Sequence, residues 1–195
     1  GEWKNDFTQG AVIGGPVLFD GVVLVGSEDG YLYAFNAFDG ERLWRFATEG
    51  LREAKGKEQR IWSTPAVSNG VVYFGAMDDY IYALSVKDGE LLWRYKTQGA
   101  VNSDPLVIDD IVVVGSFDRK LYALDANNHG APLWTFEADG WFWAGAITDG
   151  ELIYTASMDG VVYALDPNRT DGESPEWYRD LGEAVIATPF LAKDE

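Results

Sequence analysis

The chain has 195 residues, of which 47% are hydrophobic and 14% aromatic, so it can bury a sizeable core and is not a disordered segment. Its formal net charge of -17 opposes binding to the phosphates of nucleic acids or to anionic membrane surfaces, and we expect no nucleic-acid partner. The absence of cysteine excludes a disulfide framework, a thiol nucleophile and a cysteine-based zinc site, and no run is apolar for the roughly 18 residues of a transmembrane segment.

The first residues, GEWKNDF, lack the basic start and apolar body of a signal peptide, and the chain begins with Gly1 rather than methionine. We therefore expect a processed or excised segment of a longer protein. The location of the protein has to be inferred from other features.

In chain order, the dominant feature is one strand-like segment that recurs four times. Its copies are VVLVGSEDGYLYAFNAFDGERLW at 22–44, VVYFGAMDDYIYALSVKDGELLW at 71–93, IVVVGSFDRKLYALDANNHGAPLW at 111–134 and LIYTASMDGVVYALDPNRTDGESPEW at 152–177. A shorter element precedes each copy, and GEAVIATPF at 182–190 is a fifth element of that shorter kind. An internal repeat of about 40 residues predicts a repeat architecture.

Each repeat predicts four short strands, which we letter A to D. In the first repeat they are AVIGGPVLF, VVLVGS, YLYAFN and RLWRFA, with alternating polarity and many β-branched or aromatic residues. The pairs Asp29-Gly30, Asp39-Gly40 and Asp159-Gly160 supply the positive φ that tight hairpins require. Four strands in about 40 residues are typical of a β-propeller blade.

The predicted fold class is therefore all-β: a single β-propeller segment over residues 1–195, made of four-stranded antiparallel blades. The expected blades lie at approximately 10–48, 59–98, 99–138 and 140–181. A lone D strand is expected before the first blade, and 182–195 is expected to be the A strand of a further blade.

A second motif links strands C and D: an alanine, then Asn, Ser or Asp two residues on, then a glycine turn and a tryptophan. In the first repeat it consists of Ala34, Asn36, Asp39-Gly40 and Trp44, and it recurs three times. Together with strings such as VGSEDGYLYAF, this motif makes nearly the whole chain resemble the propellers of the pyrroloquinoline quinone (PQQ) repeat family. The Trp-Asp dipeptide of WD40 blades does not occur.

The resemblance implies that the repeated tryptophan docks one blade onto the next, with its ring against the alanine of its own motif and its N–H bonded across the seam. This docking role is expected for Trp44, Trp93, Trp134 and Trp177. Trp3 is expected to be the matching residue of a preceding blade. Rings of this family have about seven or eight blades, so we expect roughly half of a ring, completed by its remaining blades or by self-association.

The family also contains quinoprotein dehydrogenases, in which PQQ lies near the ring axis with Ca²⁺ and an aspartate acts as general base. Those enzymes often carry adjacent cysteines against the cofactor, and this chain has none. The acidic and amide residues of the A strands cluster only at Asn102, Ser103 and Asp104, and Asp104 is expected to be a solvated or turn-capping residue rather than a catalytic base. We therefore expect no catalytic residue and no cofactor, with PQQ and calcium confined to the alternative interpretation.

Two further stretches were considered as metal sites. Asp166–Gly172 resembles the start of a calcium loop, but its glycine is one place late and Trp177 stands where the loop requires glutamate. His129 lies in a lengthened turn without a second histidine. We expect no metal at either place.

The residues before a recurrent proline on the A strands indicate what lines the channel of the ring. This proline column consists of Pro16, Pro65, Pro105, Ala146 and Pro189. The position four before it is uniformly apolar and expected to be core: Val12, Ile61, Val101, Phe142 and Val185. Because side chains alternate between the two faces of a strand, the positions three and five before the proline column face the channel instead of the core. These positions include Trp62, Trp143 and Trp141, the tryptophans that the docking motif does not explain.

We therefore expect a binding patch near one mouth of the channel, formed by Arg60, Trp62, Asn102, Asp104, Trp141 and Trp143. A basic stretch at 49–60, with Arg52, Lys55 and Lys57, is expected to be a solvated loop or to offer cations to a partner.

The predicted function is a non-catalytic binding and scaffolding module, similar to the outer-membrane assembly lipoproteins of the PQQ-repeat family. That resemblance implies an extracytoplasmic location, with protein partners or a small ligand at the channel mouth. Two alternatives stay open: a fragment of a PQQ- and calcium-dependent dehydrogenase, and a ligand-sensing ectodomain of a receptor or kinase.

Overall fold

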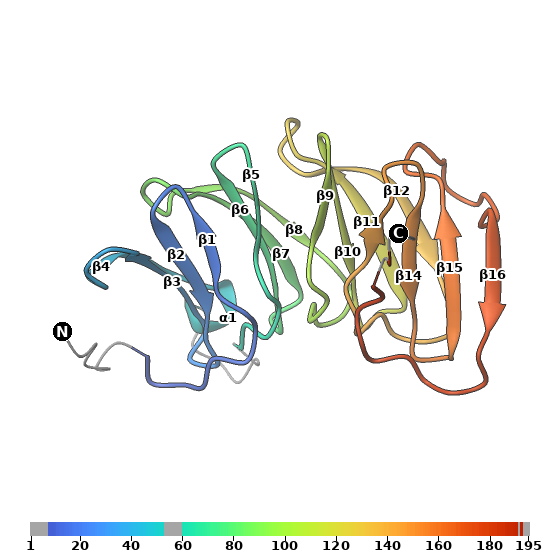
Figure 1. Ribbon diagram of the computed structural model, residues 1–195, viewed down its shortest axis with the longest axis horizontal. Helices are drawn as coiled ribbons and strands as arrows, with labels where there is room; N and C mark the ends of the chain where they lie inside the picture. Colours follow the sequence, from blue (N-terminus) through green and yellow to red (C-terminus); the bar gives the residue numbers. More distant parts are fainter. Residues whose placement is uncertain (1–7, 53–59, 191, 193–195) are drawn as a thin grey trace.

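The chain folds into four four-stranded antiparallel sheets that stand side by side along an arc (Figure 1). The computed structural model describes residues 8–52, 60–190 and 192. Within each sheet the strands pair in chain order, so every sheet is a meander. The predicted all-β propeller with four full blades is confirmed.

The strands are short and follow the repeat of the sequence. Blade 1 contains β1 (Val17–Phe19), β2 (Val22–Gly26), β3 (Tyr31–Asn36) and β4 (Arg42–Ala47). Blade 2 contains β5 (Ala66–Ser68), β6 (Val71–Ala76), β7 (Tyr80–Ser85) and β8 (Leu91–Lys96). Blade 3 contains β9 (Leu106–Ile108), β10 (Ile111–Gly115), β11 (Lys120–Asp125) and β12 (Ala131–Glu137). Blade 4 contains β13 (Ile147–Thr148), β14 (Ile153–Ala156), β15 (Val161–Leu165) and β16 (Trp177–Asp180).

A single-turn helix, α1 (Glu49–Arg52), follows blade 1. None of the helical structure within residues 8–52, 60–190 and 192 is long and apolar enough to cross a membrane. The lone D strand expected around Trp3 lies outside the described residues.

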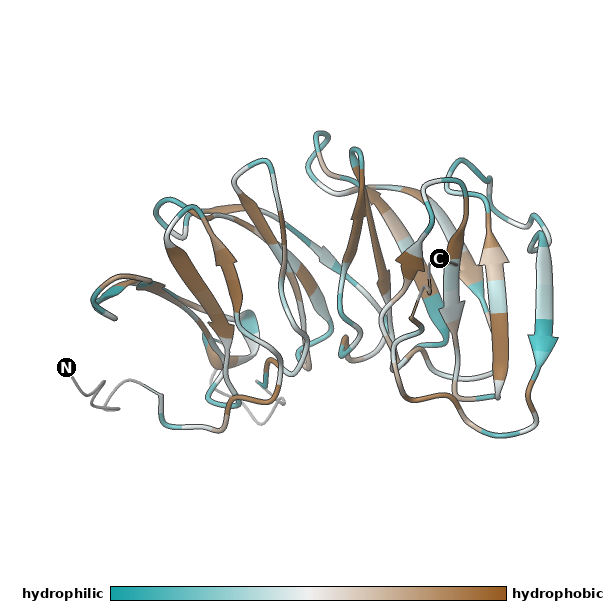
Figure 2. Cartoon of the chain, in the orientation of Figure 1, coloured by the Kyte–Doolittle hydropathy of each residue, from teal (hydrophilic) through white to brown (hydrophobic). Residues whose placement is uncertain are grey.

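The hydrophobic core lies between the blades rather than in one centre. One buried cluster joins blades 1 and 2, a second joins blades 2 and 3, and a third joins blades 3 and 4. Figure 2 shows the same pattern, with hydrophobic residues concentrated on strands such as β2 and β6 and hydrophilic residues on the turns and on β16. Each blade is therefore stabilised mainly by its neighbours.

A glycine in the second strand of the first three blades, Gly26, Gly75 and Gly115, lets the next blade approach closely. A Cβ atom added to Gly75 would lie 2.3 Å from Cγ1 of Val101, and one added to Gly115 would lie 2.4 Å from Cβ of Phe142. Val101 and Phe142 are both fully buried. Phe142 is thus core, as expected from its column.

Three of the four repeated tryptophans bind the following blade. Nε1 of Trp44 donates to the carbonyl of Val86 at 2.9 Å. Trp93 and Trp134 donate in the same way, to the carbonyls of Ala126 at 3.2 Å and Pro167 at 2.8 Å. The turn glycine of the next blade packs on the ring, because a Cβ on Gly89 would lie 2.7 Å from Cδ2 of Trp44. Trp177, on blade 4, is 45% exposed, and the centroid of its ring lies 5.9 Å from that of Tyr154.

The segments before the proline column belong to no strand, although the sequence placed them on the A strands. The inner strands begin only after the proline column, at Ala66 in blade 2 and at Leu106 in blade 3. The physical reason is that the preceding segment bridges two blades instead of pairing within one sheet: the N–H of Val101 donates to the carbonyl of Ala76 at 3.0 Å, whereas the carbonyl of Ala100 accepts the N–H of Phe117 at 2.9 Å. Trp62, Asn102 and Trp143 therefore lie on connectors between blades.

The segment 182–190, expected to begin a further blade, runs as a connector of this kind. Its Thr188 accepts a hydrogen bond from the N–H of Gly145 at 3.1 Å. Thr64 accepts one from Gly15 at 3.0 Å in the same position of the repeat.

Candidate functional site

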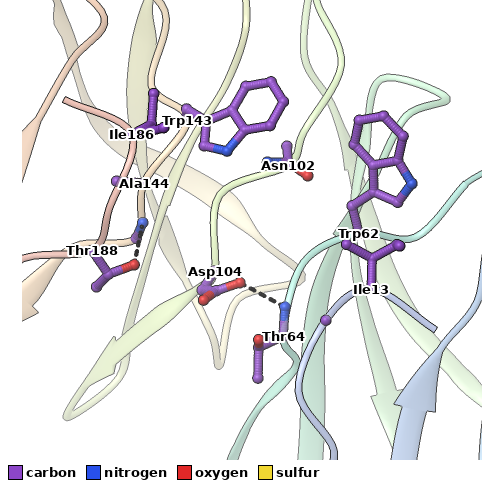
Figure 3. A pocket seen from close by; sticks show the side chains of 11 residues that line it. Ile13, Trp62, Thr64, Asn102, Asp104, Trp143, Ala144, Ile186 and Thr188 are labelled. Atoms are coloured by element: carbon purple, nitrogen blue, oxygen red, sulfur yellow. Dashed lines mark hydrogen bonds between the residues drawn. The ribbon is translucent and has the colours of Figure 1, made fainter. Parts of the chain in front are cut away.

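The connectors meet around a cavity of about 240 Å³ (Figure 3). Most residues of its wall come from two positions of the repeat. One position lies three residues before the proline column, and the other lies one residue before it. The first position contributes Ile13, Trp62, Asn102, Trp143 and Ile186. The second contributes Thr64, Asp104, Gly145 and Thr188. The alternation of the sequence therefore identified the face of the connectors that lines the cavity.

Two indole rings form the aromatic part of the wall. The ring centroids of Trp62 and Trp143 are 6.3 Å apart, and their planes are inclined by 46°. Figure 3 shows the two rings on either side of Asn102. The rings come from blades that are not adjacent, since the connector with Asn102 lies between them.

Phe117 supports the tryptophans from the side and was missed at the sequence level. It stacks on Trp143 with centroids 5.3 Å apart and planes at 19°, and on Trp141 with centroids 5.3 Å apart and planes at 16°. Phe117 stands two residues after the glycine of strand β10, where the other repeats carry Glu28, Met77 and Met158. A large apolar residue in three of four copies was the signal that this turn position is packed.

Glu28 occupies the same position in blade 1 and fixes Trp62. Nε1 of Trp62 donates to Oε1 of Glu28 at 3.0 Å. The guanidinium carbon of Arg60 lies 5.5 Å from the centroid of the Trp62 ring. Trp62 is thereby held in one orientation by a hydrogen bond and a cation–π contact.

The structure brings together four of the six predicted patch residues, namely Trp62, Asn102, Asp104 and Trp143. Arg60 and Trp141 do not line the cavity. Arg60 is exposed beside Trp62, and Trp141 is 49% exposed on the far side of Phe117. They belong to the rim of the site rather than to its wall. Ligand binding by the patch stays a prediction.

Asp104 is the one titratable side chain in the wall of this cavity. Its Oδ1 accepts a hydrogen bond from the N–H of Thr64 at 2.6 Å. Burial raises the pKa of Asp104 above its ordinary value, and the hydrogen bonds from Thr64 partly oppose that shift. The carboxylate thus bonds across two connectors, from the one before blade 3 to the one before blade 2, and this hydrogen bond is not the cap of a local turn.

Asn102 is only 9% exposed, and its side-chain amide forms no hydrogen bond to another described residue. Buried polar groups in proteins are nearly always hydrogen-bonded, to protein, water or ligand. The amide faces the cavity (Figure 3) and is not one of the fully buried polar atoms that lack a partner among the described residues, so water or a ligand in the cavity can hydrogen-bond to it.

The donor set does not fit the calcium ion of the quinoprotein alternative. Calcium takes six to eight oxygen ligands in most sites, often with several carboxylates. The cavity offers one carboxylate, Asp104, and one of its oxygens accepts the Thr64 amide. Within the described ranges, no three His, Cys, Asp or Glu side chains are grouped closely enough to hold a metal ion.

The two stretches with some features of metal sites, Asp166–Gly172 and the segment around His129, form turns. Oδ1 of Asp166 accepts the N–H of Asn168 at 2.7 Å, and Oδ1 of Asp171 accepts the N–H of Thr135 at 2.6 Å. His129 adopts a positive φ of 53° in its turn.

The basic stretch at 49–60 is partly tied to the blades. Nη1 of Arg52 contacts Oε1 of Glu49 at 3.3 Å, and the same oxygen pairs with Arg94 of β8. The Arg52 guanidinium also lies over the ring of Phe46, 4.8 Å from its centroid. Lys55 and Lys57 lie outside the described residues.

Comparison with known proteins identifies the family to which this propeller is similar. A family model described as outer membrane protein assembly factor BamB matches residues 2–62 and 54–140. No curated protein sequence matches the chain.

Solved structures share the fold at low sequence identity. BamB from Moraxella catarrhalis is 22% identical with a TM-score of 0.75, over 92% of this chain and 52% of that chain. The computationally designed Ika4 protein is 18% identical with a TM-score of 0.68, over 84% of this chain and 95% of that one. The quinohemoprotein alcohol dehydrogenase ADHIIG from Pseudomonas putida HK5 is 21% identical with a TM-score of 0.73, over 90% of this chain and 35% of that one.

The chain spans about half of the length of the BamB structure that it matches. These structural likenesses establish the propeller fold, and the family model extends over most of the sequence, including the first three blades. The chain belongs to the family of PQQ-repeat β-propellers described as outer membrane protein assembly factor BamB.

Proposed function

We propose that this propeller segment is a non-catalytic binding and scaffolding module that works outside the cytoplasm and holds a protein partner or a small ligand at the inner face of its arc. Membership of the BamB family supports an assembly role. The remaining blades of a ring, or a second copy of the chain, would complete the propeller around this face.

The observation that carries the proposal is the composition of the cavity. Its wall combines two indole faces, a buried amide without a described partner and one carboxylate bonded to a backbone amide. Apolar surface with a few convergent polar groups is typical of a binding site.

A second candidate function is a fragment of a quinoprotein dehydrogenase. It is favoured by the fold shared with ADHIIG, a quinohemoprotein alcohol dehydrogenase. It is disfavoured by the donor set at Asp104, which lacks the oxygen ligands that calcium prefers.

Adding PQQ and CaCl₂ to the purified propeller with its full set of blades separates the two candidates. For a binding module we expect neither a saturable change in PQQ absorbance nor a rise in melting temperature. A saturable rise in both would reject the non-catalytic proposal.

The scaffold role itself is tested by crosslinking in the cell envelope of the source organism. We expect a defined crosslinked partner that the variant Trp143→Leu loses and that the charge control Glu90→Gln keeps, since Glu90 is exposed on an outer turn of blade 2. The same crosslinks from both variants, or none from the unaltered chain, would contradict the proposed role of this face.

A further inference from the structure

We infer that the cavity is a recognition site for a primary ammonium or guanidinium group at the end of an aliphatic chain, such as a lysine or arginine side chain. The inference rests on the proposed function, because it assumes that the cavity binds a ligand. It goes further by assigning the chemistry of that ligand.

The aromatic wall is suited to a cation. The rings of Trp62 and Trp143 form an open V, with centroids 6.3 Å apart and planes at 46°. A cation in the mouth of this V can lie within about 6 Å of both centroids, the range of cation–π attraction, for which tryptophan is the best partner. Phe117 covers one face of Trp143, so the opposite face is the one available to a ligand.

The polar wall supplies acceptors for N–H donors. Asp104 offers a carboxylate, and Asn102 offers an amide oxygen that no described residue uses. Figure 3 shows both side chains on one connector, with Asn102 between the rings in this view and Asp104 further along the connector, beside Thr64. A cation with several N–H groups can bond to both acceptors while its charge lies near the indoles.

Other ligand classes fit this wall less well. An anion would meet the carboxylate of Asp104 in a chain of net charge -17. A purely apolar group would leave the buried amide of Asn102 without a hydrogen bond, which is costly. A quaternary ammonium would satisfy the rings but neither acceptor.

The size of the cavity favours a side chain over a cofactor. Its volume of about 240 Å³ lies below the ~300 to 1,000 Å³ of typical small-molecule sites. Arg60 provides an internal precedent, because its guanidinium already lies 5.5 Å from the centroid of Trp62, outside the cavity.

Isothermal titration of the chain tests the inference with two pairs of probes. The first pair is n-butylammonium and n-butanol. The second is a capped pentapeptide with lysine between glycines and the same peptide with norleucine. We expect each cationic probe to bind at least about tenfold more tightly than its neutral counterpart, as one buried charge contact would provide. Binding by the free amine and by the peptide indicates a general cation site, whereas binding by the peptide alone indicates a protein partner.

Variants show whether the effect arises in this cavity. Asp104→Asn and Trp143→Leu should each weaken the cationic probes by about tenfold, whereas Trp143→Phe, which keeps an aromatic face, should weaken them less. Glu90→Gln removes one exposed charge elsewhere and should leave binding unchanged. Circular dichroism confirms that each variant is folded, and the neutral probes report any general loss of the cavity.

Equal binding of lysine and norleucine peptides, or no binding of any cationic probe at millimolar concentration, would overturn the inference. So would full binding by both Asp104→Asn and Trp143→Leu. Failure of the scaffold role is distinguishable: in that case the lysine peptide binds as expected but no partner is crosslinked in the envelope.

Discussion

At the scale of single residues, the position in the repeat decides whether a tryptophan is core or site. Trp93 is 7% exposed and its Nε1 binds the next blade, so it closes a seam. Trp143 is half-buried, lines a cavity and has Phe117 on one face. The two indoles have similar chemistry, but their removal should have different consequences.

We expect Trp93→Ala to lower the free energy of unfolding by about 3 to 5 kcal/mol, the usual cost of deleting a large core side chain. For Trp143→Ala we expect a loss of only about 1 kcal/mol, the scale of one aromatic pair. Urea unfolding followed by circular dichroism measures both. A loss of several kcal/mol for Trp143→Ala would identify it as core and contradict its assignment to the site.

Asp104 should make stability depend on pH in an unusual direction. Burial raises the pKa of its carboxyl in the folded chain, so the folded state binds the proton more tightly than the unfolded state. The stability from this group is therefore present below its ordinary pKa and is lost as pH rises through the raised pKa. The amide and hydroxyl of Thr64 oppose the shift through their hydrogen bonds to the carboxylate.

Asp104→Asn removes that ionisation and can keep an oxygen for the Thr64 amide. We expect the stability of the variant relative to the unaltered chain to increase between pH 4 and pH 7, as measured by urea unfolding at each pH. A difference that is constant over this range, or that falls, would show that Asp104 is not desolvated.

At the scale of the elements, the repeat predicted the blades because their strands pair locally. Alternation, turn glycines and spacing lie within about 40 residues, and so do the hydrogen bonds that they specify. The connectors were wrongly placed on strands because their hydrogen bonds are shared between two blades, as from Val101 to Ala76 in one and from Phe117 to Ala100 in the next. Nothing in the local pattern of a connector distinguishes a partner in its own sheet from one in its neighbour.

The candidate site, like the fold, was predicted only in part from the sequence. Alternation identified the face that carries Trp62, Asn102 and Trp143, and the structure places all three in one cavity. Phe117 and Glu28 were missed because they reach the site from a turn of the preceding blade. Arg60 and Trp141 share the alternation of the wall residues, but their greater distance from the proline column places them at the rim.

The glycine column gives a prediction about the seams. In Gly75→Ala the new methyl group would lie 2.3 Å from Cγ1 and 2.9 Å from the carbonyl oxygen of Val101. Backbone cannot yield easily there, so we expect a loss of about 1 to 3 kcal/mol, the cost of overpacking a core. Thermal and urea unfolding measure it.

Gly15→Ala is the matched control for Gly75→Ala. Its new methyl group would lie 3.4 Å from Cγ2 of Thr64, an ordinary contact with a side chain. Equal losses in the two variants would mean that glycine flexibility, rather than the approach of the next blade, explains the column.

At the scale of the whole molecule, the net charge of -17 opposes compaction by self-repulsion. Salt screens such repulsion, with a Debye length of about 10 Å at 0.1 M. We therefore expect the melting temperature to rise when NaCl is increased from about 0.02 M to 0.2 M. An unchanged or lower melting temperature in calorimetry would show that the charges are already balanced locally.

The connectors also tie each blade to both of its neighbours. The N–H of Val101 donates to the carbonyl of Ala76 in blade 2, and the carbonyl of Ala100 accepts the N–H of Phe117 in blade 3. A blade exchanged between members of the family therefore has to bring connectors that fit the blade on each side of it. Exchanges that keep matched connectors should fold, and exchanges that do not should fail.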